Sequence, residues 1–153
     1  MTIKNPEQIA AMRHGGKILG KILLALAKSA KPGVTTKQLD NRSRVLMKQY
    51  NVQPSFLGYH GFTASICTPK NEEVVHTIPD NRPLKEGDVL TIDGGVIHEG
   101  FHTDSAITIG IGKIDEKTEK MIEVGEKALH KAISLAKAGI PIKTLSRAIQ
   151  QTI

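Results

Sequence analysis

The apolar positions of the first fifty residues recur at helical spacing. One stripe runs to about residue 30, and a second, which contains Leu39 and Met47, runs to about Tyr50. Residues three and four apart share one face of a helix, so each stripe predicts an amphipathic helix. The first stripe comprises Ile9, Met12, Ile18, Leu19, Ile22, Leu23 and Leu26.

Each of these helices carries its own start signal. Asn5 is followed by proline and then by Gln8, and Thr35 is followed three residues later by Gln38. Both patterns are typical of a capping box, in which the two side chains bond each other's backbone amides. The sequence Lys-Pro-Gly at 31–33 separates the two helices.

The helical spacing disappears between residues 51 and 87, where glycine and proline punctuate the chain. Short strands are expected around Ser65–Thr68 and Val74–Ile78, and the second of them contains His76. The next stretch, DVLTIDGGVIHEGFHTDSAITIG, alternates apolar and polar residues and predicts two strands joined by a tight turn.

Two more helices are expected after Gly112. DEKTEKMIEVGEKALHKAISLAK predicts a third helix closed by Gly139, and IPIKTLSRAIQQTI begins a fourth. Residues 27–44 also resemble residues 135–148, which suggests a two-fold repeat. Residues 1–112 would form the first repeat and 113–153 the start of a second, within one incomplete domain; chance similarity of two helix pairs is the alternative.

Two aspartates interrupt the predicted hairpin. If the loop is His98–Glu99, Asp93 lies directly opposite Asp104; if it is Glu99–Gly100, the two become diagonal neighbours. Either loop of even length leaves both on one face, whereas a three-residue loop would separate them. That face also carries Thr91, Gly95, His102 and Thr108, and the other carries Leu90, Ile92, Val96, Phe101, Ile107 and Ile109.

Two neighbouring carboxylates on a partly buried face are costly to ionise. Solvent, a shared proton or a bound cation would each offset the cost. Hard oxygen ligands on rigid strands suit a divalent cation, and a pair of such ions can activate water. The spacing alone leaves all three alternatives open.

Other residues near this hairpin in sequence could serve the same site. His76 could donate to a substrate carbonyl, although a lone histidine is more often structural. The segment LGYHGF places Tyr59, His60 and Phe62 between glycines, as in a pocket wall or a self-packed turn. Cys67 is expected to be a small buried apolar residue rather than a nucleophile.

Composition narrows the class of protein. The chain is 39% apolar and 24% charged, with a net charge of +6 and a pI near 9.5. Its lysines are scattered over predicted helices, which favours solvated helix faces over a nucleic-acid site. A single cysteine excludes an intramolecular disulfide, and no segment is apolar enough for a signal peptide or a membrane span. A cytoplasmic location is expected.

The segments LGYHGF, NEEVVHTIP and EGDVLTIDGGVIHEGFHTDSA together resemble the type I methionine aminopeptidases. This resemblance implies the pita-bread fold, an α/β fold of the α+β type, of which the chain would form the first pseudo-symmetric half and the opening helices of the second. It also implies removal of the N-terminal methionine from nascent proteins, with a pair of divalent metal ions (Co, Mn, Fe or Zn) as cofactors.

The resemblance assigns roles to individual residues. Asp93 and Asp104 would be two of five metal ligands, and His76 would contact the substrate amide as a catalytic residue. Asn71 would belong to a nearby monovalent-cation site. The methionine pocket would be lined or supported by Tyr59, His60, Phe62 and Cys67.

The chain departs from the family pattern in three ways. Thr77 stands where glycine is usual, and Phe56 where a smaller residue is common. The remaining metal ligands, a histidine and two glutamates, are absent, so an inactive monomer is expected. A homodimer or a separate C-terminal half could complete the site, and the ribosome is a further candidate partner. A non-enzymatic module that binds protein or RNA is the alternative function.

Overall fold

Two capped helices, α1 (Pro6–Ser29) and α2 (Thr36–Gln49), begin the chain in the computed structural model, which describes residues 3–153. Both predicted capping boxes are confirmed. The Gln8 amide donates to Asn5 Oδ1 at 2.9 Å, and the Gln38 amide donates to Thr35 Oγ1 at 3.1 Å. In each box the glutamine side chain accepts a hydrogen bond from the backbone amide of the capping residue.

The sheet is built around one long central strand, β3 (Val89–His98). The ten-residue β4 (Phe101–Gly110) pairs with one edge of β3, and two short strands, β1 (Gln53–Pro54) and β2 (Ile66–Cys67), pair with the other edge. All pairs are antiparallel. The predicted strand around 65–68 is therefore confirmed as β2, whereas β1 was not predicted.

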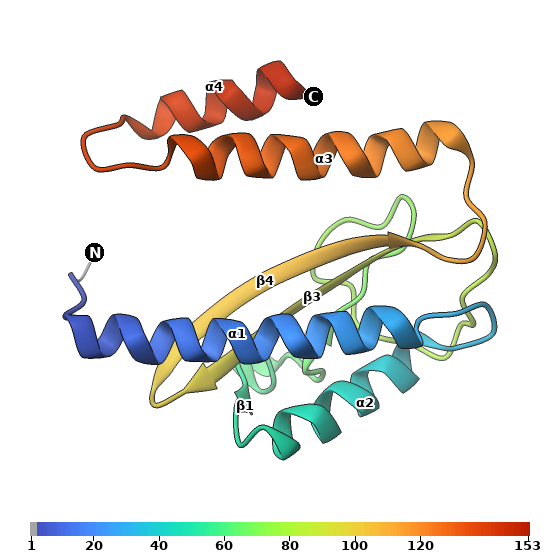
Figure 1. Ribbon diagram of the computed structural model, residues 1–153. Helices are drawn as coiled ribbons and strands as arrows, with labels where there is room; N and C mark the ends of the chain where they lie inside the picture. The colour runs from blue at the N-terminus through green and yellow to red at the C-terminus, as the bar shows by residue number, and fades with distance from the viewer. Residues whose placement is uncertain (1–2) are drawn as a thin grey trace. The chain divides into compact units, whose positions relative to one another are not determined.

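Helix α1 covers one face of this sheet, as Figure 1 shows. Its apolar stripe packs on the even-numbered residues of β3, so the face that carries the aspartates stays free of α1. Burial of each large aliphatic side chain contributes about 1.5–3 kcal/mol, which fixes the face that each strand turns to the core. The fully buried aliphatic residues include Leu19, Ile22, Leu26, Leu90, Ile92 and Val96.

The hairpin turn between β3 and β4 decides how the aspartates face each other. Glu99 and Gly100 both have positive φ, 49° and 79°, and His98 pairs with Phe101. This is the two-residue turn whose twist matches that of the strands. Asp93 therefore lies opposite Ala106 and Asp104 opposite Gly95. Direct opposition, which a His98–Glu99 loop requires, is wrong; the diagonal arrangement on one face is correct.

The strand expected at Val74–Ile78 does not form. His76 has a φ of 67°, which is incompatible with an extended strand, and the Thr77 hydroxyl donates to the Val74 carbonyl at 3.0 Å. The segment is held instead as a loop, with the Thr68 amide donating to the Thr77 carbonyl at 3.0 Å. Tertiary contacts outweigh the β propensity of the valines and isoleucine here.

Residues up to Lys113 form one compact unit and Ile114–Ile153 form another. The second unit consists of α3 (Glu116–Leu135) and α4 (Ile142–Thr152), which pack on each other. Both helices were predicted, but α3 ends before Gly139, which has a φ of 84° in the connection. The repeat interpretation, with its boundary at 112, stays a prediction. Among the described residues, no helix is long and apolar enough to cross a bilayer.

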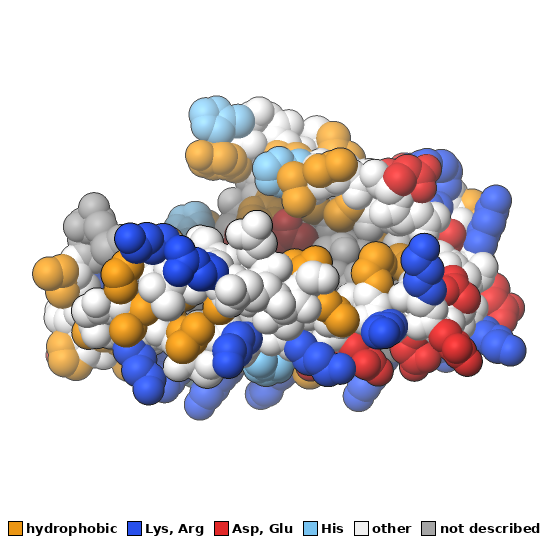
Figure 2. Space-filling view, turned by 90° about the horizontal axis from the view of Figure 1, so that it is seen from above, with side chains coloured by type: hydrophobic (Ala, Val, Ile, Leu, Met, Phe, Trp, Pro, Cys, Tyr) orange, Lys and Arg blue, Asp and Glu red, His pale blue; other side chains and the backbone are white. Residues whose placement is uncertain are grey.

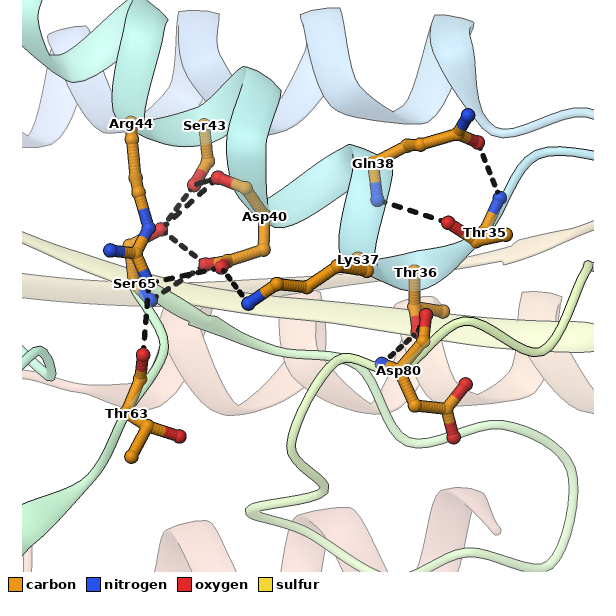
Figure 3. A network of polar contacts seen from close by, with 10 residues as sticks. All are labelled: Thr35, Thr36, Lys37, Gln38, Asp40, Ser43, Arg44, Thr63, Ser65 and Asp80. Atoms are coloured by element: carbon orange, nitrogen blue, oxygen red, sulfur yellow. Dashed lines mark hydrogen bonds and ion pairs between the residues drawn. The ribbon is translucent and has the colours of Figure 1, made fainter.

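A buried carboxylate ties α2 to the strand region (Figure 3). Asp40 is fully buried and accepts hydrogen bonds from the Ser65 amide and hydroxyl, both at 2.7 Å. Lys37 and Arg44 approach its second oxygen at 3.4 and 3.1 Å, and Ser43 and Ser65 share a hydrogen bond. Because Ser65 directly precedes β2, the network positions that strand. Cys67 of β2 lines the hollow described below.

Asp40 makes stability depend on pH in the acid range. Burial by itself raises the pKa of this carboxyl, but the bonds from Ser65 and Arg44 outweigh burial and lower it. Because the pKa of Asp40 is lower in the folded state, its ionised form stabilises the fold fully at pH values above the pKa of the unfolded chain, about 3.9. This stabilisation is lost as the pH falls through the pKa of the folded state. Urea unfolding between pH 6 and pH 3 should show this loss, and Asp40→Asn should flatten the dependence. An unchanged slope in that variant would contradict the assignment.

Candidate metal and substrate site

A hollow of about 540 Å³ opens on the sheet face that α1 leaves free. It brings together all seven residues that sequence reasoning assigned to the metal and substrate site. This hollow is lined by Phe56, Tyr59, His60, Gly61, Phe62, Cys67, His76, Ile78, Asp93 and Asp104. Ile78 was not foreseen, because it reaches the hollow only through the loop that replaces the expected strand.

Asp93 and Asp104 provide the negative charge of the hollow. They project from adjacent strands as diagonal neighbours, Asp93 half-buried and Asp104 exposed. Burial raises the pKa of Asp93, the Asp104 carboxylate raises it further, and His76 offsets part of the increase. The two carboxylates therefore sense each other electrostatically, and a cation between them would stabilise both.

Cys67 forms part of the wall beside the carboxylates. It pairs with Asp93 across β2 and β3 and is almost fully buried. Burial, together with Asp93 and Asp104, raises the pKa of its thiol to about 11. The thiol therefore stays protonated at neutral pH, which fits the prediction of a small apolar wall residue and gives no nucleophile.

His76 reaches the hollow from the loop, and its side chain is exposed. The residue that follows it, Thr77, makes two hydrogen bonds that anchor the loop, one through its hydroxyl and one through its carbonyl. The Thr77 hydroxyl thus supplies a local tether that a glycine at this position could not supply. The imidazole is left free to donate to a ligand in the hollow.

Aromatic rings also line the hollow. Phe56 and Phe62 meet edge to face with centroids 6.4 Å apart, and Tyr59 and His60 do so at 4.4 Å. Tyr59 and His60 belong to the short 3-10 helix η1 (Tyr59–Gly61). Edge-to-face pairs hold rings in defined places, so this wall offers an ordered, largely apolar surface.

Gly95 makes room for the Phe56 ring. A Cβ at Gly95 would lie 2.9 Å from Ser55 Cβ and 3.0 Å from Phe56 Cε1. Gly95→Ala is therefore expected to cost about 1–3 kcal/mol through overpacking and to shift the aromatic wall. Urea unfolding followed by circular dichroism measures the cost. The matched control is Gly16→Ala on α1, where a Cβ has open space and helix propensity predicts a gain of about 0.5–1 kcal/mol. Equal stability of Gly95→Ala and the parent would contradict the close fit.

Asn71 does not line the hollow and lies in the turn directly after Lys70, whose backbone bridges Leu90 of β3. Its side-chain amide donates to Asp88 Oδ1 at 2.9 Å, and its side-chain oxygen accepts from the Val89 amide at 2.9 Å. Its backbone is left-handed, with a φ of 55°. The side chain thus has a structural role here, and the monovalent-cation role stays a prediction.

The donor set of the hollow fits a divalent cation in kind but not in number. Two carboxylates suit a hard cation. However, the described residues contain no group of three or more His, Cys, Asp or Glu side chains placed to hold a metal. A second, larger hollow of about 670 Å³, near the end of α2, contains Glu99 as its only acid and offers no such pair.

Comparison with known proteins is consistent across sequence and structure. The model of metallopeptidase family M24 matches residues 10–153. A methionine aminopeptidase of Clostridium acetobutylicum is 45% identical over 152 residues, 99% of this chain and 61% of the relative. Methionine aminopeptidase 1 of Bacillus subtilis is 42% identical, over 96% and 59%. The chain thus spans about three-fifths of the length of the curated relatives it matches.

Solved structures give the same picture. The methionine aminopeptidase of Thermotoga maritima matches with a TM-score of 0.97 at 34% identity, over 100% of this chain and 62% of that one. The prolidase of Pyrococcus furiosus matches with a TM-score of 0.87 at 22% identity, over 99% and 43%, a likeness of fold alone. The predicted fold, part of a pita-bread fold of mixed α and β structure, is confirmed.

Proposed function

Because the chain belongs to metallopeptidase family M24, we propose that it forms part of a metal-dependent aminopeptidase that removes the N-terminal methionine from nascent polypeptides in the cytoplasm. The single observation that carries this proposal is the pair of carboxylates, Asp93 and Asp104, which share one hollow with His76 and an aromatic wall.

The acidic end of the hollow would hold the metal. Asp93 and Asp104 would supply two carboxylate ligands to divalent ions such as Co, Mn, Fe or Zn. A bound ion in such a site polarises the substrate carbonyl and makes water nucleophilic at neutral pH. A shared proton is the alternative for two close carboxylates, and the match to a metallopeptidase family favours the metal instead.

The other residues of the hollow would bind the substrate. The His76 imidazole would donate to the carbonyl of the scissile amide and stabilise the negative charge that develops on its oxygen. Phe56, Tyr59, His60 and Phe62 would surround the methionine side chain, and the buried thiol of Cys67 would complete the apolar wall. Burial of an unbranched thioether against such rings is favourable.

These 153 residues alone are proposed to lack activity. Two carboxylates rarely hold a catalytic metal firmly. The described residues provide no group of three metal-ligating side chains. The missing ligands would come from a further segment of the protein, a second copy or a separate chain. Association of the protein with the ribosome would fit this function, since the substrate residue is the first part of a nascent chain to emerge.

The test compares the chain alone with a chimera. The chimera joins this chain to the part of the Clostridium acetobutylicum relative that it does not cover, and both are assayed with Met-Ala-Ser and Mn²⁺. Metal-dependent methionine release by the chimera, and none by the chain alone, is expected. If the chimera folds but is inactive in an assay in which the full-length relative is active, the peptidase proposal is refuted and a binding module is left. Family-like turnover by the chain alone would refute the need for further ligands.

A further inference from the structure

The net positive charge of the chain is concentrated in its first part, because acidic residues are scarce there. Residues 1–71 contain eleven of the 21 Lys and Arg residues but only two of the 15 Asp and Glu residues. One of those two acids, Asp40, is buried and paired with Lys37 and Arg44. Exposed positive charge therefore dominates the surface of α1 and α2. On the face shown in Figure 2, Lys and Arg side chains are widespread, whereas Asp and Glu side chains gather toward the right-hand end.

Helix α1 arranges its cations in a row. Arg13, Lys17 and Lys21 follow each other at spacings of four residues, on the side opposite the buried stripe, and all three are exposed. Successive cations are thus about 6 Å apart along the helix axis. Lys28 continues the row, although its place in the last turn also suits the helix dipole.

Among residues 3–153, these cations have no acidic partners. No ion pair involves Arg13, Lys17, Lys21 or Lys28, nor Arg42 on α2, within the part of the chain that the structure describes. Like charges four residues apart on a helix repel and destabilise it by a few tenths of a kcal/mol per pair. A bound polyanion would remove that cost.

Helix α3 shows what an ordinary solvated helix of this chain looks like. Its lysines alternate with acids, and Lys127 pairs with Glu123 at 3.3 Å. The difference lies in the acids, because α1 contains Glu7 as its single acidic residue and none beside the row of cations. Tyr50, at the end of α2, adds an aromatic ring next to the row, with Lys21 Nζ 5.9 Å from its centroid.

We propose that the outer surface of α1 and the end of α2 bind RNA through its phosphate backbone, without sequence specificity. A row of unpaired cations beside an exposed aromatic ring is the arrangement that binds single strands, where phosphates meet cations and a base stacks on the ring. This departs from the expectation that the lysines form ordinary solvated helix faces, because the overall charge count did not reveal which cations lack acids. The surface lies on the opposite side of the sheet from the hollow and does not depend on peptidase activity.

The test uses the 153-residue chain and a fluorescein-labelled uridine 20-mer. One variant carries Arg13→Gln, Lys17→Gln, Lys21→Gln and Lys28→Gln. The matched control carries Lys117→Gln, Lys120→Gln, Lys131→Gln and Lys137→Gln, which removes the same charge from exposed positions of the second unit. The α1 variant is expected to bind at least about ten-fold more weakly and to reduce the slope of log K against log salt by about 3, whereas the control stays within about two-fold of the parent.

Three results would overturn the proposal. Equal losses in both variants would mean that net charge alone drives binding. Absence of salt-dependent binding by the parent would remove the site altogether. The third result is binding of phosphatidylserine and phosphatidylcholine vesicles through the α1 row without binding of the 20-mer. The α1 surface would then bind lipid and not RNA. All eight substituted positions are exposed, so the helices are expected to persist in both variants. Circular dichroism of each variant checks this.

Discussion

Replacement of Asp40 by alanine is expected to lower the free energy of unfolding by about 3 kcal/mol. The change leaves the buried Ser65 amide and hydroxyl without their acceptor, and an unsatisfied buried donor costs about 1–3 kcal/mol. It also leaves a small cavity in a fully buried position. Lys37 and Arg44 keep access to water, with side chains 42% and 38% exposed, so loss of the ion pairs adds little.

Urea unfolding at pH 7 measures this effect against Lys37→Ala. That control removes one ion pair of Asp40 but none of its bonds to Ser65, and a half-exposed pair contributes at most about 1 kcal/mol. A cost for Asp40→Ala no larger than that for Lys37→Ala would show that the network does not hold α2 to the strand region.

Loss of either hollow carboxylate is expected to reduce kcat/KM of the active chimera by more than about 100-fold. Removing a residue that merely orients a metal ligand costs 10–100-fold, and Asp93 and Asp104 are proposed as ligands themselves. The amide of Asn is isosteric with the carboxylate but carries no charge, so Asp93→Asn and Asp104→Asn test the charge and not the shape.

The same assay with His76→Ala separates metal binding from substrate activation. This change should lower kcat by about 100-fold and leave the metal concentration for half-maximal activity unchanged, whereas Asp104→Asn should raise that concentration. The proposed assignment of roles fails if His76→Ala and Asp104→Asn shift the metal requirement equally.

The helices and the polar face of the hairpin could be predicted because their signals are local. A capping box needs only four consecutive residues, as at Asn5 and Gln8, and any even loop leaves Asp93 and Asp104 on one face. The choice between the two even loops was harder. It depends on Glu99 adopting a positive φ, which glutamate does less readily than asparagine or aspartate.

Features set by contacts distant in sequence could not be predicted. The loop of His76 is fixed by the bond from Thr68 to Thr77 and by the Lys37 amide, which donates to the Asp80 carbonyl at 2.8 Å. The sequence does not mark Asp40 as buried either, because an aspartate beside arginine on a helix is ordinary on a surface. Its role follows only from the position of Ser65.

The most direct test of the account is a titration of the isotopically labelled 153-residue chain with Mn²⁺, followed by NMR line broadening of backbone amides. The amides around Asp93 and Asp104 should broaden first, with a dissociation constant weaker than about 0.1 mM, as expected of a site with few ligands. The double variant Asp93→Asn, Asp104→Asn should lose this effect, whereas the exposed control Asp115→Asn should keep it. Broadening that begins elsewhere, or that survives in the double variant, would contradict the claim that these two carboxylates share a metal ion.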